Sequence, residues 1–196
     1  MVLPYQHPAR TRAVTRVRST LLAASIQTIR EMGWEPRYLE ALPKERHAEL
    51  KMLAAGVWVP LELAETHYHA CDAMHLSKEE VERAGASVGE RTQKSFVGTL
   101  GRFAAGAGAT PWIVIANVHR IYARMIDGGD HCAYRLGPKD ALIVNVGCPL
   151  VDIPYFRMSS VGSYRATAAV VSQVVYAHEV PKYRRPRTLG VRVSWV

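Results

Sequence analysis

Residues 110–147, TPWIVIANVHRIYARMIDGGDHCAYRLGPKDALIVNVG, contain the change of hydrophobic period that decides the fold class. Thr110 before Pro111 predicts a helix start, because an N-cap residue followed by proline at the first helical position is typical of one. Apolar residues then recur every three or four positions as far as Met125, and Gly128–Gly129 predicts the end of this helix.

After the glycine pair, the apolar period changes to two. Residues 131–136 and 140–147 are therefore predicted to be strands, and the turn sequence Gly-Pro-Lys-Asp between them predicts a hairpin over 131–147. The same alternation predicts a C-terminal strand over 187–196.

Helical periods dominate the rest of the chain. The longest predicted helix opens with the capping box Ser77-Lys78-Glu79-Glu80, in which serine and glutamate side chains satisfy free backbone donors. Its early glycines, Gly85 and Gly89, predict that another backbone packs closely against it. The predicted helices before and after the quoted stretch span residues 20–32, 43–55, 61–75, 77–104 and 160–177.

This order of elements predicts an α+β fold, with N-terminal helices packed on a small, mainly antiparallel sheet. The length of 196 residues suits one domain, residues 1–196. Residues 1–18 are either a basic arm or a first strand, and the residue pattern leaves both open.

The formal charge of +8 is unevenly distributed. Residues 1–30 contain five arginines and no acidic residue, and residues 153–196 contain seven basic residues against Glu179. This pattern fits either an anionic partner such as nucleic acid or a solvated basic face. The chain has no nucleic-acid-binding motif, which favours the solvated face.

Several function classes lack their sequence signals. No apolar run is long enough to cross a membrane and no secretory segment begins the chain, so we expect a cytoplasmic protein. Cys71, Cys132 and Cys148 show no Cys-x-x-Cys spacing, and reduced thiols are expected. Neither a phosphate-binding loop nor a recognisable nucleophile arrangement occurs, so we expect no enzymatic activity.

The best metal-site candidate is His67, Cys71 and His75. On a helix these positions lie on one face, and imidazole and thiolate ligands suit Zn²⁺. The alternative is an ordinary helix whose histidines and cysteine are packing or surface residues. For haem, an axial ligand such as His119 is the corresponding candidate, and its alternative is a packed histidine.

A second candidate site is the cluster Tyr155-Phe156-Arg157, together with Trp112 as a ligand- or partner-binding residue. Exposed tyrosine, phenylalanine and arginine have the composition of an interface hot spot. The alternative is that both rings pack in the core and Arg157 faces solvent.

A series of short motifs carries a family resemblance. They are Leu76-Ser77-Lys78-Glu79-Glu80, Gly89-Glu90-Arg91-Thr92, Gly108-Ala109-Thr110-Pro111-Trp112, Gly128-Gly129, Gly137-Pro138-Lys139-Asp140-Ala141, Gly147-Cys148-Pro149-Leu150, Ile153-Pro154-Tyr155-Phe156-Arg157 and Arg192-Val193-Ser194-Trp195. Together they resemble a family of uncharacterised bacterial paralogues of about this length, over residues 15–196. That family resembles a wider superfamily of 4-vinyl reductase domains, haem–nitric-oxide-binding domains and vesicle-tethering TRAPP subunits.

The resemblance implies an α+β ligand-binding or scaffolding fold that often dimerises, sometimes around an apolar cavity. Haem-binding members use an axial histidine followed by a Tyr-x-Ser-x-Arg motif. Tyr155-Phe156-Arg157-Met158-Ser159 places its arginine elsewhere and Tyr164-Arg165-Ala166 lacks the serine, so the motif does not carry over. Some 4-vinyl reductase domains bind zinc through cysteines, of which Cys132 and Cys148 could be remnants.

We therefore predict a non-enzymatic sensor or interaction module, without a cofactor, that binds a small apolar ligand or a protein partner as a homodimer. A zinc or haem sensor using the His67–His75 region is the alternative. A nucleic-acid-binding protein with a basic surface is a further alternative.

Overall fold

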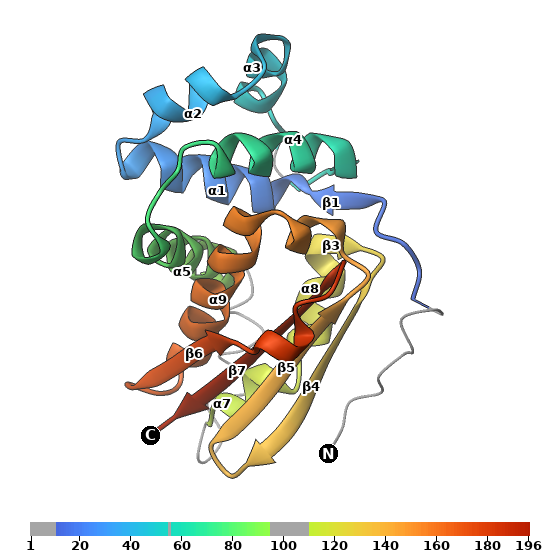
Figure 1. The fold of residues 1–196 in the computed structure, drawn as a ribbon, viewed down its shortest axis with the longest axis vertical. Helices are drawn as coiled ribbons and strands as arrows, with labels where there is room; N and C mark the ends of the chain where they lie inside the picture. Colours follow the sequence, from blue (N-terminus) through green and yellow to red (C-terminus); the bar gives the residue numbers. More distant parts are fainter. Residues whose placement is uncertain (1–10, 55, 95–109) are drawn as a thin grey trace.

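The computed structural model describes residues 11–54, 56–94 and 110–196, and it has the predicted α+β architecture (Figure 1). A layer of N-terminal helices lies above a central helix pair, and a four-stranded sheet lies below that pair. The upper layer contains α1 (Ser19–Glu31), α2 (Glu35–Ala41), α3 (Lys44–Lys51) and α4 (Leu61–Asp72), and the pair is α5 (Lys78–Lys94) and α9 (Pro154–Ala169).

The larger sheet is antiparallel, with strand order β4-β5-β7-β6. Its strands are β4 (Asp130–Gly137), β5 (Asp140–Val146), β6 (Val175–Glu179) and β7 (Thr188–Trp195), so the predicted hairpin and C-terminal strand are confirmed. A smaller sheet joins β1 (Arg16–Arg18), β2 (Trp58–Pro60) and β3 (Ile126–Asp127). The short helices α7 (Pro111–Ile115) and α8 (Val118–Met125) precede β3.

The central strand β5 of the larger sheet is buried on both faces. Residues of β5 alternate, so that Ala141 and Ile143 join the main core below the helices. The opposite face carries a smaller cluster of Cys132, Leu142, Val144 and Val146, against which Tyr183 packs. No helix in the described part of the chain combines the length and apolar character that crossing a bilayer requires.

The predicted helix over 160–177 is corrected at both ends. The helix begins at Pro154, where a proline at the first helical position loses no hydrogen bond. It ends at Ala169, and Val175–Glu179 instead forms β6, paired with β7. The valine-rich sequence between them explains the error, because β-branched residues favour extended backbone while their spacing still fits a helix.

Other boundaries also differ from the predictions. The helix predicted from Thr110 is divided in two, and Asn117 at the division donates from its side chain to the carbonyl of Ile113 at 2.8 Å. Helix α2 was not predicted. Residues 16–18 form a strand, as one alternative proposed, whereas residues 1–10 and the predicted helical stretch 95–104 lie outside the described residues.

The capping box that opens α5 is confirmed. The backbone N–H of Ser77 donates to a carboxylate oxygen of Glu80 at 2.8 Å, and the N–H of Glu80 donates to the Ser77 hydroxyl at 3.3 Å. The box fixes where α5 begins, and thereby which of its residues face α9.

Glycines bring the backbones of α5 and α9 into direct contact, as the sequence predicted for Gly85. A Cβ atom at Gly85 would lie 1.9 Å from the carbonyl oxygen of Ser159, and one at Gly162 would lie 1.9 Å from the carbonyl oxygen of Glu82. Ser163 adds a hydrogen bond across this contact, donating to the carbonyl of Gly85 at 2.7 Å. Each helix therefore occupies the space that a side chain of the other would need.

We expect Gly85→Ala and Gly162→Ala each to lower the free energy of unfolding by about 3 kcal/mol, because neither backbone can yield to the added methyl group. Urea unfolding measures this loss. Gly137→Ala is the matched control, since a Cβ there would meet Asp140 at an ordinary 3.6 Å. Wild-type stability in both helix variants would contradict the close contact.

Candidate functional site

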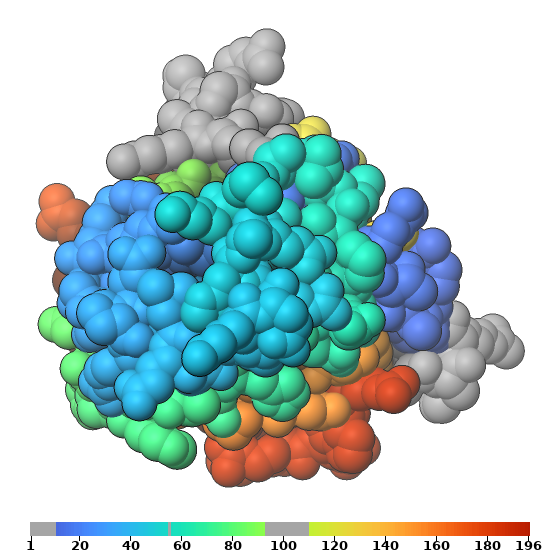
Figure 2. Space-filling model, turned by 90° about the horizontal axis from the view of Figure 1, so that it is seen from above, coloured from blue at the N-terminus to red at the C-terminus, as the bar shows by residue number. Residues whose placement is uncertain are grey.

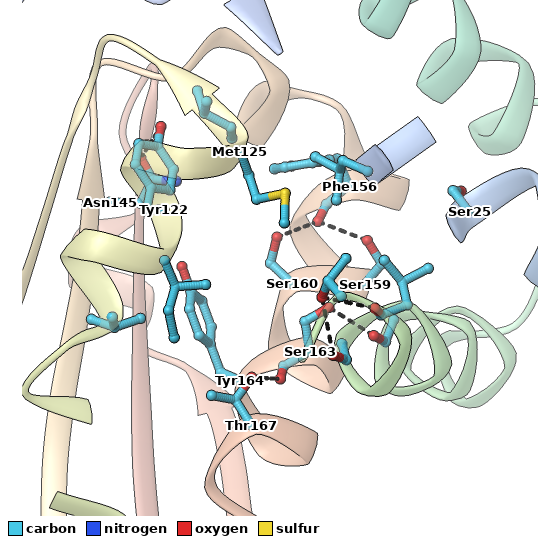
Figure 3. A pocket seen from close by; sticks show the side chains of 18 of the residues that line it. Ser25, Tyr122, Met125, Asn145, Phe156, Ser159, Ser160, Ser163, Tyr164 and Thr167 are labelled. Atoms are coloured by element: carbon cyan, nitrogen blue, oxygen red, sulfur yellow. Dashed lines mark hydrogen bonds between the residues drawn. The ribbon is translucent and has the colours of Figure 1, made fainter. Parts of the chain in front are cut away.

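A cavity of about 140 Å³ lies between α5, α8 and α9, with the β4–β5 hairpin at one end (Figure 3). Most of its wall is apolar, and Met125 and Phe156 lie across it from each other. None of the described residues that line it is an aspartate, glutamate, lysine or arginine. The described part of its wall is therefore uncharged.

Four polar side chains form one end of the cavity. His131 on β4 and Asn145 on β5 are direct cross-strand partners, so both face the helices. The hydroxyl of Tyr122 donates a long hydrogen bond of 3.5 Å to Oδ1 of Asn145, and its ring centroid lies 4.0 Å from that of His131. Nε2 of His131 is hydrogen-bonded to the hydroxyl of Tyr164, and its Nδ1 is buried without a partner among the described residues.

Burial keeps this cluster uncharged at neutral pH. Desolvation lowers the pKa of His131 to about 3, with a smaller contribution from His119. The same desolvation raises the pKa values of the Tyr122 and Tyr164 hydroxyls. The imidazole is thus neutral and both phenols keep their protons.

Hydroxyl groups of α9 face the cavity from the other side (Figure 3). Ser159 and Ser160 both donate to the carbonyl of Phe156, and Ser163 donates across to Gly85. Because each proton is used in these bonds, the oxygens offer lone pairs to the cavity as hydrogen-bond acceptors.

The predicted cluster Tyr155-Phe156-Arg157 is not an exposed surface. Tyr155 is 3 % exposed and Phe156 is 8 % exposed, and both line the cavity wall. Arg157 points away from it and binds Glu179 at 2.8 Å and the carbonyls of Val151 and Thr188. The physical reason is that Pro154 starts α9 here, and the helix turns both rings into the core.

Trp112 lies at the far end of the sheet. Its indole N–H donates to the carbonyl of Pro138 at 2.7 Å, and its ring packs edge-on against Trp195 with centroids 5.1 Å apart. It does not line the cavity.

The predicted metal ligands are only partly brought together. His67 is fully buried, with Nδ1 bonded to the Tyr38 hydroxyl at 2.7 Å and Nε2 to Ser25 at 3.0 Å, and Cys71 lies beside it at 3.7 Å. His75 is exposed beyond the end of α4. Across the described residues, no group of three potential metal-ligating histidine, cysteine, aspartate or glutamate side chains converges. Desolvation also raises the pKa of the Cys71 thiol, which disfavours the thiolate that a metal needs.

The first described residues lie close to one part of the basic C-terminal segment. Thr11 lies against Gly147, whose N–H donates to the carbonyl of Arg187 at 2.8 Å. In Figure 2 the first described residues, in blue at the right edge, lie close to the late residues in orange and red. Several of these arginines are paired within the chain: Arg12 and Arg16 with Asp127, and Arg157 and Arg184 with Glu179.

Comparisons with known proteins show the fold. No protein-family model and no curated protein matches this chain. An oxygen-binding H-NOX domain related to soluble guanylate cyclases is 13 % identical with a TM-score of 0.54, covering 91 % of this chain and 94 % of its own. A mutant of the T. tengcongensis H-NOX protein is 14 % identical with a TM-score of 0.61, covering 91 % and 97 %. A structure concerned with haem redox potential and protein-induced porphyrin distortion is 12 % identical with a TM-score of 0.62, covering 91 % and 99 %.

The residues around the cavity do not fit haem. A volume of about 140 Å³ is comparable to the engineered cavity of about 150 Å³ that holds benzene, and a porphyrin is several times larger. The two propionates of haem would meet no cationic side chain among the described lining residues. Tyr-x-Ser-x-Arg occurs nowhere in the sequence. His119 on α8 has a buried Nδ1 without a described partner, but it does not line the cavity.

The residues that define the polar end were missed in the sequence. The available signal was the presence of His131 and Asn145 at positions of the two hairpin strands whose neighbours two residues away are apolar. A polar pair on the inward face of a hairpin indicates a buried polar contact, because polar groups are rarely buried without partners.

We expect acid to destabilise the protein through His67 and His131. Burial lowers both pKa values to about 3, below the ordinary value of 6.5. Below pH 6.5 the two imidazoles are therefore protonated in the unfolded chain but neutral in the native state. The free energy of unfolding consequently decreases as the pH falls from 6.5 toward 3. Each histidine contributes a slope of about 1.4 kcal/mol per pH unit.

Urea unfolding at a series of pH values measures this slope. His131→Phe should lower the slope of the free energy of unfolding against pH by the contribution of one histidine. Replacement of the exposed His69 by asparagine should leave this slope unchanged. An unchanged slope in His131→Phe would show that His131 is protonated in the native protein.

Proposed function

We propose that this chain is a small-ligand-binding sensor domain whose ligand occupies the cavity between α5, α8, α9 and the β4–β5 hairpin, and that it acts without haem. The observation that carries the proposal is a largely apolar cavity whose described lining residues are uncharged, with the polar side chains of Tyr122, His131, Asn145 and Tyr164 at one end. Cavities that combine apolar walls with a few convergent polar groups are typical of ligand sites.

The position of the cavity supports a sensor. Helix α9 lines it with Phe156, Ser160 and Tyr164, and the same helix packs on α4, α5, β6 and β7. A ligand that shifts α9 therefore acts on both the helical layer and the sheet at once. The fold shared with an oxygen-binding H-NOX domain is consistent with ligand sensing.

Binding is favoured over catalysis by the state of the reactive groups. All three cysteines are buried, and burial raises the pKa of each thiol, to about 11 for Cys148. The cavity itself holds neutral groups, and none of its described residues is a carboxylate or an amine.

Haem binding is the second candidate function. It is favoured by the fold of the solved structures whose descriptions name H-NOX and haem, and by the unpaired Nδ1 atoms of His119 and His131. It ranks second because the volume of about 140 Å³ is much smaller than a porphyrin and none of the described lining residues is a cation that could meet the propionates.

Benzene and hemin separate the two candidates. Benzene at ten times its dissociation constant should stabilise the protein by about 1.4 kcal/mol, which raises the thermal midpoint by about 3–5 °C. Ser160→Leu should abolish the shift, because Ser160 faces the cavity (Figure 3). Thr66→Leu is the matched control, since its hydroxyl makes the same bond to the carbonyl four residues earlier without lining the cavity.

Hemin should leave the thermal midpoint unchanged and keep the broad absorption of the free compound. A narrowed Soret band that saturates at one hemin per chain would establish the haem alternative. Absence of a benzene shift in the wild-type protein would contradict the ligand cavity.

The proposal includes a homodimer formed through β6. This strand pairs only with β7 among the described strands. The N–H of Val196 donates to the carbonyl of Val174, and the N–H of Val180 donates to the carbonyl of Gly190, so the backbone groups of Val174 and Val180 face β7. By alternation, the backbone groups of Val175, Ala177 and Glu179 point outward.

A second copy of the chain fits this edge. In an antiparallel pair of β6 strands with a two-fold axis at Ala177, Ala177 lies opposite Ala177 and Val175 lies opposite Glu179 of the other copy. Each outward N–H of these residues then faces a carbonyl of the other strand. Tyr176, which is 59 % exposed, would be covered in the pairing, and the exposed Val170 and Val174 lie nearby. Exposed edges of this kind favour pairing with another strand.

We expect light scattering after size exclusion to give twice the chain mass of 21.8 kDa. Tyr176→Lys should yield the monomer, because a charge on an edge strand opposes pairing. Val57→Lys, at another exposed apolar residue, should remain dimeric. A monomeric wild-type protein would overturn this interface.

A further inference from the structure

We propose that a second cleft, between the start of α9, the end of β6 and residues 184–186, binds a small organic anion that has a carboxylate or phosphate group on an apolar body. This cleft has a volume of about 510 Å³, and its described lining residues are three arginines, two carboxylates and three apolar residues. None of these described residues lines the cavity between α5, α8 and α9, so the cleft is separate from the ligand site proposed above.

One arginine of the cleft is held in place by the fold. Arg157 on α9 has a side chain that is 11 % exposed, and it donates to Glu179 of β6 at 2.8 Å. It also donates to the carbonyls of Val151 at 2.7 Å and Thr188 at 3.0 Å. Because these acceptors come from three segments of the chain, the guanidinium is a fixed positive charge in the wall of the cleft.

Both carboxylates of the cleft already accept hydrogen bonds. Besides the bond from Arg157, the two oxygens of Glu179 accept from Nε and Nη2 of Arg184 at 3.1 and 2.9 Å. The bonds from Arg184 and Arg157 lower the pKa of Glu179, which is therefore ionised at neutral pH and lies between two cations. Asp152 is exposed, and one of its oxygens accepts the backbone N–H of Arg187 at 2.8 Å.

Arg185 carries a charge that no described side chain balances. It is exposed and lines the cleft, and its side chain has no hydrogen bond or ion pair with another described residue. The described wall therefore has a net charge of +1, from three arginines and two carboxylates. Residues 180–196 contain five basic residues and no acidic one, so the adjoining segment reinforces this sign. An anion that enters the cleft meets an excess of positive charge.

The type of cation indicates the type of anion. A planar guanidinium donates two parallel hydrogen bonds to a carboxylate or phosphate group, and Arg184 makes such a pair with Glu179. The side chains of Arg184 and Arg185 are both exposed, so they are free to turn toward a bound anion. A ligand carboxylate or phosphate would thus repeat, beside Glu179, a contact that the chain already makes.

The remaining wall indicates the body of the ligand. Pro154, Met158 and Pro186 line the cleft, and they supply two rigid rings and one adaptable thioether as apolar surface. Small-molecule sites have volumes of roughly 300–1,000 Å³, and the cleft lies within this range. The cleft therefore has room for an apolar body of about two rings beside the anionic group.

Four compounds test the anion and the apolar body separately. Phenyl phosphate and benzoate have both parts, inorganic phosphate has only the anion, and phenol has only the ring. Each is titrated into ¹⁵N-labelled protein and followed by amide shifts. We expect phenyl phosphate or benzoate to bind at one molecule per chain, with shifts concentrated in residues 152–158 and 179–187. The tighter of the two should bind at least about tenfold more tightly than inorganic phosphate or phenol.

Arg185→Gln tests the unbalanced charge. Its side chain has no described partner, so the variant should fold like the wild-type protein and bind the preferred anion about tenfold more weakly, the effect of one charge-assisted hydrogen bond. Arg187→Gln is the matched control, because Arg187 is an exposed arginine of the same segment that does not line the cleft. An equal loss in both variants would show diffuse attraction to a basic surface and overturn the site.

The other outcomes are equally decisive. If neither phenyl phosphate nor benzoate binds the wild-type protein, the site is refuted, whatever the result with benzene. If inorganic phosphate or phenol binds as tightly as the preferred anion, the cleft does not recognise the combination and the proposal fails. Ser160→Leu, which alters only the smaller cavity, should leave anion binding unchanged, and a loss of binding in this variant would place the anion in that cavity instead.

Discussion

Where α5 and α9 cross, a glycine on each helix lets the backbone of the other take the place of a side chain. This contact fixes the position of α9 along and around its axis, because a close backbone contact tolerates less rotation than layers of flexible side chains. The orientation of α9 then decides which residues face inward. Tyr155 and Phe156 pack near α4, and further along the helix Ser160 and Tyr164 face the cavity. The cavity thus depends on two glycines as much as on the residues that line it.

The sequence predicts those parts of the fold that are determined locally. The hairpin, the C-terminal strand and the Ser77–Glu80 capping box are all signalled within a few residues, and all are present. The boundary between α9 and β6 was not predictable in this way, because the spacing of the valines there fits a helix as well as a strand. Pairing with β7 decides in favour of the strand. The division between α7 and α8 lies at Asn117, whose side chain donates to the carbonyl of Ile113, and the apolar spacing across it did not indicate a break.

Less of the candidate site than of the fold could be predicted from the sequence. Composition left open whether Tyr155 and Phe156 form an exposed surface or pack in the core, because exposure is set by distant parts of the chain. In the structure both rings are buried, as the second interpretation proposed. The cavity arises where eight of the described elements approach one another without filling the space, which no local pattern encodes. The likeness to H-NOX structures at 12–14 % identity concerns the fold. The same fold can carry different chemistry, because function resides in the site. Here the described residues that line the cavity carry no charge, which is a property of this site and not of the shared fold.

The two faces of the larger sheet are protected very unequally. The helices cover one face, whereas the small cluster on the other is covered by the ring of Tyr183, which sits so close to Gly190 that a Cβ there would lie 2.6 Å from it. Because local openings start where the fewest contacts must be lost, we expect residues 180–187 to open before the main core does. Such an opening uncovers Cys132 and leaves Cys71 and Cys148 enclosed. We therefore expect the three thiols to differ in kinetic accessibility, with Cys132 the first to react with an alkylating reagent.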